Sequence, residues 1–336
     1  MGLIYYYGRL HSTRVGLMLA TFALLLSTAC EPFVDVPPPK DELVRRTVFA
    51  NEETAAAAVR GIYSTMASTS AFAGGGFTSI SVLAGLYADD LVYRGSVSDY
   101  QLFHENRLLP DHPFIGENWK KIYEIVYMAN AVIEGIGSET GLGNDAVSRL
   151  EGEARFLRVF CYFYLVNLWG GVPLVTSTDY QINRTLPKTD PANIYLFMER
   201  ELSEAISLLP DDYSHTAGER VLPTKWAAHA LLSRIYLYTQ QWEKAITEAT
   251  AVIGQSALFG LSDISAVFLK NSDETIWQLL PVQPGFNTWT GNALIPSSSS
   301  RTPFWVVSDQ LTALFAENDR RRDNWINSNN VGGIEY

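Results

Sequence analysis

The chain has 336 residues, a formal net charge of −11 at pH 7 and an aromatic content of 12%. A chain this acidic repels nucleic acid, so a nucleic-acid partner is not expected. It contains only two cysteines, Cys30 and Cys161. Because Cys30 is predicted to carry lipid, no internal disulfide is expected, and the hydrophobic core has to stabilise the fold.

The N-terminus has the features of a secretory signal. Arg9 and Arg14 precede an uncharged stretch of fifteen residues, 15–29, which is shorter than the ~20 apolar residues of a transmembrane helix. The stretch ends in Leu-Ser-Thr-Ala before Cys30, which resembles a bacterial lipobox, although the leucine stands four residues before the cysteine rather than three. We predict a lipoprotein signal peptide at 1–29 and lipidation of Cys30. An ordinary signal peptide with an incidental cysteine is the alternative.

Residues 30–43 are predicted to form the lipid anchor and an extended spacer. Three consecutive prolines stand at 37–39, and such runs favour a stiff, extended chain. The remainder, 44–336, is predicted to be one helical domain. Within it we expect a helical scaffold at 51–254 and a loop-rich, ligand-binding part at 255–336.

The spacing of apolar residues, with caps and breakers at the ends, predicts most of the elements. Helices are expected at 51–69, 77–87, 117–135, 144–168, 190–209, 223–239, 241–254 and 308–315, and Asn144 or Asp145 is expected to cap the fourth of them. Long loops are expected at 89–113 and 281–304. Residues 264–269 and 275–280 are expected to be irregular or to form short strands.

The stretch 150–168 is the most informative helix. Its apolar residues cover both faces of the helix, and a helix that is apolar all round has to be buried on all sides. Gly170 and Gly171 stop it and Pro173 cannot continue it, so an extended segment is expected at 172–175. Glu151 and Arg155 stand four residues apart near its start and are expected to pair. Cys161 is too deeply placed to act as a nucleophile.

The helices at 223–239 and 241–254 are predicted to form a pair like that of a tetratricopeptide (TPR) repeat. Leu232, Ser233 and Tyr236 match the L-G-x-x-Y core of that repeat. Trp242 and Ala245 are expected to pack the second helix on the first. Helix pairs of this kind form an α-α solenoid, so the predicted fold class is mainly α, with long irregular loops packed on a TPR-like scaffold.

Several of these motifs together resemble the SusD/RagB family. They are EARFLR with the following YFYL and WGGVPLV, WAAHALLSRIYLY from residue 226, and DRRRDNW from residue 319. The resemblance implies a TPR-like scaffold in an outer-membrane, lipid-anchored protein that binds glycans or other nutrients at the cell surface. It also implies a partner, a TonB-dependent SusC-like transporter. The family continues well beyond residue 336, so the chain is expected to be C-terminally truncated.

No catalytic or metal-binding motif emerges from the sequence. The five histidines do not share ligand spacing, and no cofactor motif is present. Asp89 and Asp90 are adjacent acids, but a glycosidase needs two carboxylates that face each other across a sugar. We therefore expect a protein that is not an enzyme. A glycan hydrolase and a TPR-type scaffold that binds another protein are the alternatives.

Two predicted loops carry aromatic and polar residues together, and the resemblance implies that such loops form the binding surface. Rings stack on sugar faces, while Arg and Asn side chains address hydroxyl groups. The residues expected to bind an oligosaccharide are Asp90, Tyr93, Arg94, Tyr100 and Asn106 in the first loop, and Phe286, Asn287, Trp289, Asn292 and Trp305 in the second. Alternatively, Trp289 and Trp305 only pin their loops to the scaffold.

Overall fold

The computed structural model describes residues 45–68, 71–136, 141–281, 287–296, 298 and 301–335. The predicted signal peptide, Cys30 and the whole predicted spacer therefore lie outside the described residues, as does Phe286. The chain from residue 46 onward forms one compact unit. Helices dominate it, which confirms the predicted mainly α fold class.

The longer helices agree with the predicted ones to within a few residues. The α-helices are α2 (Arg45–Val48), α3 (Glu52–Ser68), α4 (Ile80–Tyr87), α5 (Ser98–His104), α6 (Pro113–Ile136), α7 (Asn144–Trp169), α8 (Tyr180–Asn183), α9 (Pro191–Leu208), α10 (Lys225–Tyr238), α11 (Trp242–Ile253), α12 (Trp289–Leu294), α13 (Asp309–Ala313) and α14 (Arg320–Trp325). Two 3-10 helices, η1 (Ala73–Thr78) and η2 (Ser214–Thr216), accompany them.

The strands are short and form antiparallel pairs. They are β1 (Leu91–Tyr93) with β4 (Trp305–Val307), β2 (Val172–Pro173) with β3 (Lys188–Thr189), and β5 (Asn330–Val331) with β6 (Ile334–Glu335). The pair β2–β3 occupies the extended segment predicted after Gly170, which has a φ of 73° and lets the chain leave α7 sharply.

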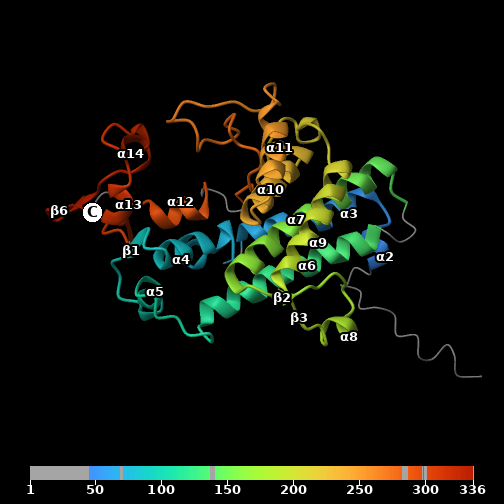
Figure 1. Cartoon of the computed structure of the whole chain (residues 1–336), viewed down its shortest axis with the longest axis horizontal. Coiled ribbons are helices and arrows are strands. Elements are labelled where there is room, and N and C mark those ends of the chain that lie inside the picture. The colour runs from blue at the N-terminus through green and yellow to red at the C-terminus, as the bar shows by residue number, and fades with distance from the viewer. Residues whose placement is uncertain are drawn as a thin grey trace, which may run out of the picture. The chain divides into compact units, whose positions relative to one another are not determined.

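Helix α7 lies at the centre of the scaffold. It packs against α6 on one side and α9 on the other, and the three helices run side by side (Figure 1). Most of its apolar residues on both faces are buried, as predicted for a helix without a polar side, whereas Leu168 near its C-terminal end is 46% exposed. Tyr162 is fully buried, and its hydroxyl both accepts from the backbone N–H of Val175 and donates to the Val175 carbonyl. The chain after the helix is thereby fixed to it.

The predicted TPR-like pair is present as α10 and α11. The Ser233 hydroxyl donates to the Ala245 carbonyl at 2.8 Å, and Ala245 is buried, so small residues allow the two helices to approach. The expectation that Trp242 packs against α10 is not confirmed. This residue is the first of α11 and is 53% exposed.

Three further expectations about local structure are corrected. The first turn of α7 has Gly143 at the N-cap with no side-chain cap, so neither Asn144 nor Asp145 has that role. The predicted loop at 89–113 contains β1 and α5, and the loop at 281–304 contains α12. The spacing of apolar residues does not predict these short elements, because they depend on contacts between segments that are distant in the chain.

The irregular segment that follows α11 is held by Arg220. The guanidinium donates to the carbonyls of Thr275 and Leu258 at 2.6 and 2.7 Å. It also lies over the rings of Tyr213 and Phe259, at 5.3 and 5.4 Å from their centroids. A planar group with five donors can hold several carbonyls at once, and this is how residues without secondary structure keep one conformation.

Among the described residues, no helix combines the length and the apolar character needed to span a membrane.

A charged cluster is buried between α7 and α9. Glu201 accepts from Arg155 at 2.9 Å and also pairs with Arg158. Arg155 in turn pairs with Glu151 at 2.7 Å, which confirms the predicted pair. Arg158 also donates to the side-chain oxygen of Asn130 on α6, at 2.7 Å. The cluster therefore links α6, α7 and α9, and it fixes their register.

We predict that Glu201→Gln lowers the free energy of unfolding by about 3–5 kcal/mol, because it leaves buried guanidinium charge without its carboxylate. Chemical denaturation followed by circular dichroism measures this. The matched control is Glu124→Gln, since Glu124 pairs with Lys121 on the surface at 3.0 Å. That control is expected to cost about 0–1 kcal/mol. Equal losses in the two variants would contradict the prediction.

Candidate functional site

The two loops that were predicted to bind ligand meet in the structure. Strand β1 pairs with β4 so that Tyr93 is opposite Trp305. The backbone N–H of Arg94 donates to the Phe304 carbonyl at 2.8 Å, and that of Ser308 donates to the Asp90 carbonyl at 3.0 Å. Segments about 200 residues apart in the chain are thus joined by a short ladder. It lies at one end of the helical scaffold, beside α4 and α5 (Figure 1).

A cluster of rings surrounds this ladder. We call it the aromatic cluster, and it consists of Phe77, Tyr93, Tyr100, Phe103, Phe114, Phe304 and Trp305. Trp305 is at its centre, with ring centroids 4.9 Å from Tyr93 and 4.8 Å from Tyr100. Its side chain is only 4% exposed. Trp305 therefore packs the loops together, and a ligand cannot reach its ring face in this conformation.

Tyr93 and Tyr100 are half-buried in the same cluster. Burial is the main cause of the raised pKa of Tyr100, and the neighbouring Tyr93 and Asp99 raise it further. The phenol therefore stays protonated at neutral pH and remains a hydrogen-bond donor. The hydroxyl of Tyr93 accepts from the backbone N–H of Val97 at 3.1 Å, which fixes the turn before α5.

The most exposed rings of the cluster are Phe77 and Phe304, which we call the exposed rim. Their side chains are 40% and 43% exposed, and their centroids lie 6.4 Å apart at an angle of 80°. Phe77 contacts Trp305 at 5.8 Å, so the rim rests on the buried part of the cluster. The guanidinium of Arg301 lies 5.6 Å from the Phe304 centroid. A ligand approaching this end would meet these three side chains.

The other predicted residues occupy different places. Trp289 begins α12 and is partly buried. A Cβ atom added to Gly76 would lie 3.4 Å from its ring, so α12 packs closely on η1. Asn106 is exposed and has a positive φ of 54° after α5, which is a turn conformation that Asn tolerates. The side chains of Asp90, Asn287 and Asn292 are exposed. Their role in binding remains a prediction.

Sequence reasoning missed Phe77 and Arg301 as site residues. Phe77 was assigned to the start of a helix, whereas it stands near the end of η1. Nothing in the local pattern indicates that η1 packs on α12 and β4, which lie more than 200 residues later. A run of three glycines before Phe77 is the one local signal, since such a run allows a close turn.

One histidine at this end, His112, belongs to the packing. His112 is buried, and its ring lies 5.1 Å from that of Phe103 and 5.2 Å from that of Phe114. Its Nδ1 accepts from the backbone N–H of Phe114 at 3.3 Å. Within the described ranges, no group of three or more His, Cys, Asp or Glu side chains is arranged to hold a metal ion.

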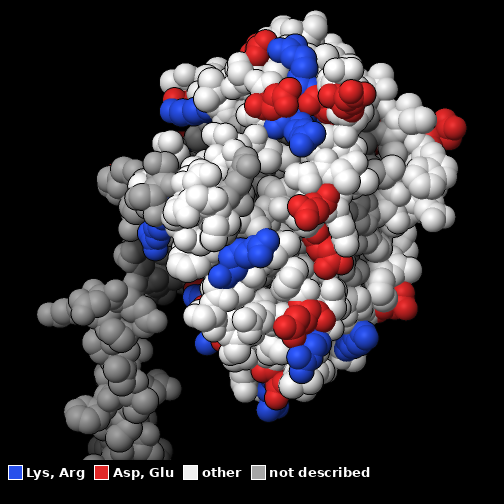
Figure 2. Space-filling view, turned by 90° about the vertical axis from the view of Figure 1, so that its left-hand side faces the viewer, with Lys and Arg blue, Asp and Glu red and all other residues white. Residues whose placement is uncertain are grey.

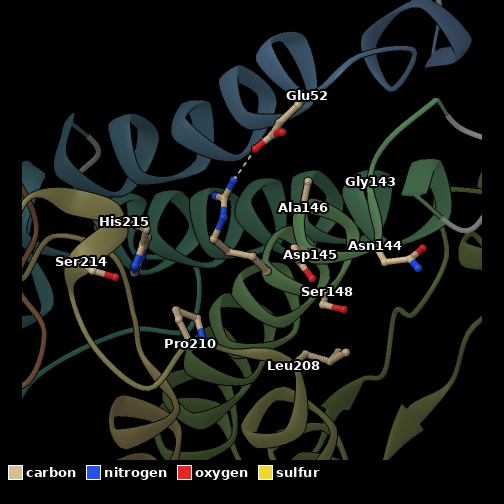
Figure 3. Close-up of a pocket in the computed structure, with 11 residues that line it drawn as sticks. Glu52, Gly143, Asn144, Asp145, Ala146, Ser148, Leu208, Pro210, Ser214 and His215 are labelled. Carbon is tan, nitrogen blue, oxygen red and sulfur yellow. Dashed lines mark hydrogen bonds and ion pairs between the residues drawn. The ribbon is translucent and has the colours of Figure 1, made fainter.

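A separate cleft of about 760 Å³ opens at the start of α7. Its lining residues come from α3, the first turns of α7, the end of α9 and the loop that contains η2 (Figure 3). They are Glu52, Gly143, Asn144, Asp145, Ala146, Ser148, Arg149, Leu208, Pro210, Ser214 and His215. No sequence motif pointed to this cleft, because its residues are polar loop and helix-end positions of ordinary composition.

Comparison with known proteins identifies the family. A family model described as "Starch-binding associating with outer membrane", the SusD-like model, matches residues 33–237, which is more than half of the chain. The chain belongs to the SusD-like family. The matched range contains the cleft and five of the seven rings of the aromatic cluster, but it ends before α12 and β4.

Relatives of this SusD-like chain are much longer. One SusD-like protein of Formosa agariphila is 24% identical over 78% of this chain and 51% of its own length. Another from the same organism is 30% identical over 72% of this chain and 47% of its own. The chain thus spans about half the length of these curated relatives.

Solved structures show the same fold. A structure named "Laminarin binding SusD-like protein" has a TM-score of 0.61 and 24% identity, and the match covers 68% of this chain and 51% of that one. A SusD superfamily protein from Bacteroides thetaiotaomicron has a TM-score of 0.67 and 22% identity, with 79% and 61% covered. At these sequence identities, the similarity to the solved structures shows that the fold is shared and nothing more.

We predict that the SusD-like domain loses stability when the pH drops below the ordinary pKa of histidine, and that His215 is the cause. Burial lowers the pKa of His215 from 6.5, and the charge of Arg149 lowers it further. The folded state then binds fewer protons than the unfolded state, so stability is complete above pH 6.5 and declines as the pH falls through that value. Relative to His215→Gln, the native chain should lose stability between about pH 7 and 5.

Denaturation curves of the two proteins across that pH range measure the effect, with Ser203→Ala on the exposed side of α9 as a control. Stability differences that stay constant with pH would contradict the prediction.

Proposed function

We propose that this SusD-like chain captures an oligosaccharide at the exposed rim and does not alter it chemically. The observation that carries the proposal is the rim itself. Two accessible rings, Phe77 and Phe304, stand on a buried aromatic base, with the Arg301 guanidinium beside them. A rigid base means that little conformational entropy is lost when a ligand binds.

The chemistry of the rim suits an uncharged sugar. Ring faces stack on the C–H faces of a pyranose, and guanidinium donors reach its hydroxyl groups. Figure 2 views the molecule from the side that lies on the left in Figure 1, and positive and negative side chains are interspersed there without a large patch of one sign. Such a surface does not select for a charged ligand.

Names of related proteins support a glycan as the ligand. The matched family is described as starch-binding, and one structure with the same fold is named as laminarin-binding. Both are glucose polymers, so a glucan is the first ligand to test. The family description also mentions association with the outer membrane, which agrees with the proposed surface location.

We predict that Phe304→Ala and Arg301→Ala each weaken binding of a soluble glucan about tenfold or more, because tenfold corresponds to about 1.4 kcal/mol, comparable with one aromatic contact. Affinity gel electrophoresis with laminarin and with starch in the gel measures this. Phe268→Ala is a matched control, since Phe268 is 76% exposed and lies outside the aromatic cluster. If all three variants migrate like the native chain, the rim is not the binding site.

We also propose that lipid on Cys30 attaches the protein to the outer membrane, with 31–43 as the spacer. Several acyl chains give stable anchoring without a spanning helix. Cys30→Ser should abolish incorporation of labelled palmitate and move the protein from the membrane fraction to the soluble fraction. Cys161→Ser is the control, because Cys161 is buried in α7 and should leave both readouts unchanged. Unchanged labelling of Cys30→Ser would refute the anchor.

The partner that we propose for delivery is a TonB-dependent, SusC-like transporter. This proposal rests on the resemblance of the chain to its family. Mild detergent extraction of native membranes, followed by capture of the tagged chain, should recover a transporter of that class. Recovery of the chain alone, under conditions that preserve other outer-membrane complexes, would argue against the partnership.

A further inference from the structure

The cleft at the start of α7 is independent of the aromatic cluster. No residue of the cluster is among those that line it. Figure 3 shows His215 and Ser214 on one side, Asn144 on the other, and Ala146, Asp145 and Ser148 along α7 between them. A volume of about 760 Å³ lies within the roughly 300–1,000 Å³ that is typical of small-molecule sites.

The polar groups around the cleft are mostly uncharged. Asn144 and Ser148 offer donors and acceptors, and the Ser214 hydroxyl, which donates to Asp212 at 2.7 Å, can still accept. The lowered pKa of His215, caused first by burial, keeps its imidazole neutral at neutral pH. A neutral imidazole has one donor and one acceptor. The set therefore matches hydroxyl groups, which also donate and accept.

The guanidinium of Arg149 at the cleft is already paired. Arg149 pairs with Glu52 at 3.1 Å and with Glu153 at 3.2 Å. Glu153 is buried behind it and also accepts from the Tyr63 hydroxyl at 2.7 Å. The guanidinium is therefore not available to hold an anion, and the carboxylate of Asp145 would repel one. Both features disfavour a ligand with a negative charge.

Apolar residues are interspersed with the polar ones. Ala146, Leu208 and Pro210 also line the cleft. An uncharged sugar ring has faces of C–H groups and a rim of hydroxyls, so it can contact both kinds of lining residue. Apart from the imidazole of His215, no aromatic ring lines the cleft in the described part of the chain. Without stacking, its affinity should be lower than that of the exposed rim.

We propose that this cleft is a second saccharide-binding site, which takes about two or three units of an uncharged oligosaccharide. The proposal rests on the proposed function, because it assumes that the chain encounters glycans. Two sites on one body would hold a polymer more tightly than either does alone, since the second contact becomes intramolecular. The exposed rim would then provide the stronger contact and the cleft an auxiliary one.

The test follows the imidazole signal of His215 by NMR in the full chain with ¹³C-labelled histidine, assigned with His215→Gln. The probes are laminaritriose and, separately, maltotriose. We expect a saturable shift of the His215 signal in the native chain, and the same shift in the Phe304→Ala protein.

The variant Ser148→Trp, which fills the cleft, should abolish this shift. Ser203→Trp is the matched control, because Ser203 is exposed on α9 and outside the cleft. Asn144→Ala should weaken the shift severalfold if Ser148→Trp does not fold.

The outcomes separate the two proposals. A shift of His215 with no effect of Phe304→Ala on laminarin or starch binding supports the cleft and refutes the rim. Binding at the rim with an unperturbed His215 signal refutes the cleft alone. Loss of the His215 shift in the Phe304→Ala protein would show that the signal only reports binding elsewhere, and it would also overturn the cleft. No response at either site would refute both proposals.

Discussion

The structure depends on the burial of α7 between α6 and α9. Because this helix is apolar on both faces, it is stable only when neighbours cover it, and the apolar residues alone would permit several registers. The cluster of Arg158, Glu201 and Asn130 removes that freedom, since its hydrogen bonds form at one alignment of the three helices only. The chain that leaves α7 is then fixed through Tyr162, so the scaffold has a defined end from which loops can project.

The aromatic cluster also holds segments together by burial, on a smaller scale. Its rings are buried around a short strand pair, and they join loops that contain little regular secondary structure. Trp305 is buried at its centre and packs the segments together. Phe77 contacts Trp305, Phe304 contacts Phe77, and both of these rings stay exposed. A binding surface made in this way is stiff even though its residues lie outside the long helices, and stiffness reduces the entropic cost of binding.

The exposed rim and the cleft differ in the physical basis of recognition. At the rim, stacking and a nearby guanidinium would dominate. In the cleft, uncharged donors and acceptors are interspersed with apolar side chains, and the positive charge of Arg149 is compensated. Both would suit neutral, hydroxyl-rich ligands.

Local patterning was sufficient for the long helices, the TPR-like pair and the sharp end of α7. Each of these depends on residues close together in the chain, where spacing, caps and breakers act directly. The family was indicated by the resemblance of whole motifs. The sites depend on contacts across about 200 residues, as in the pairing of Tyr93 with Trp305 and the packing of Phe77 on Trp305. Such contacts leave no local period, and whether a ring is a buried support or an exposed contact follows only from what the folded chain places on top of it.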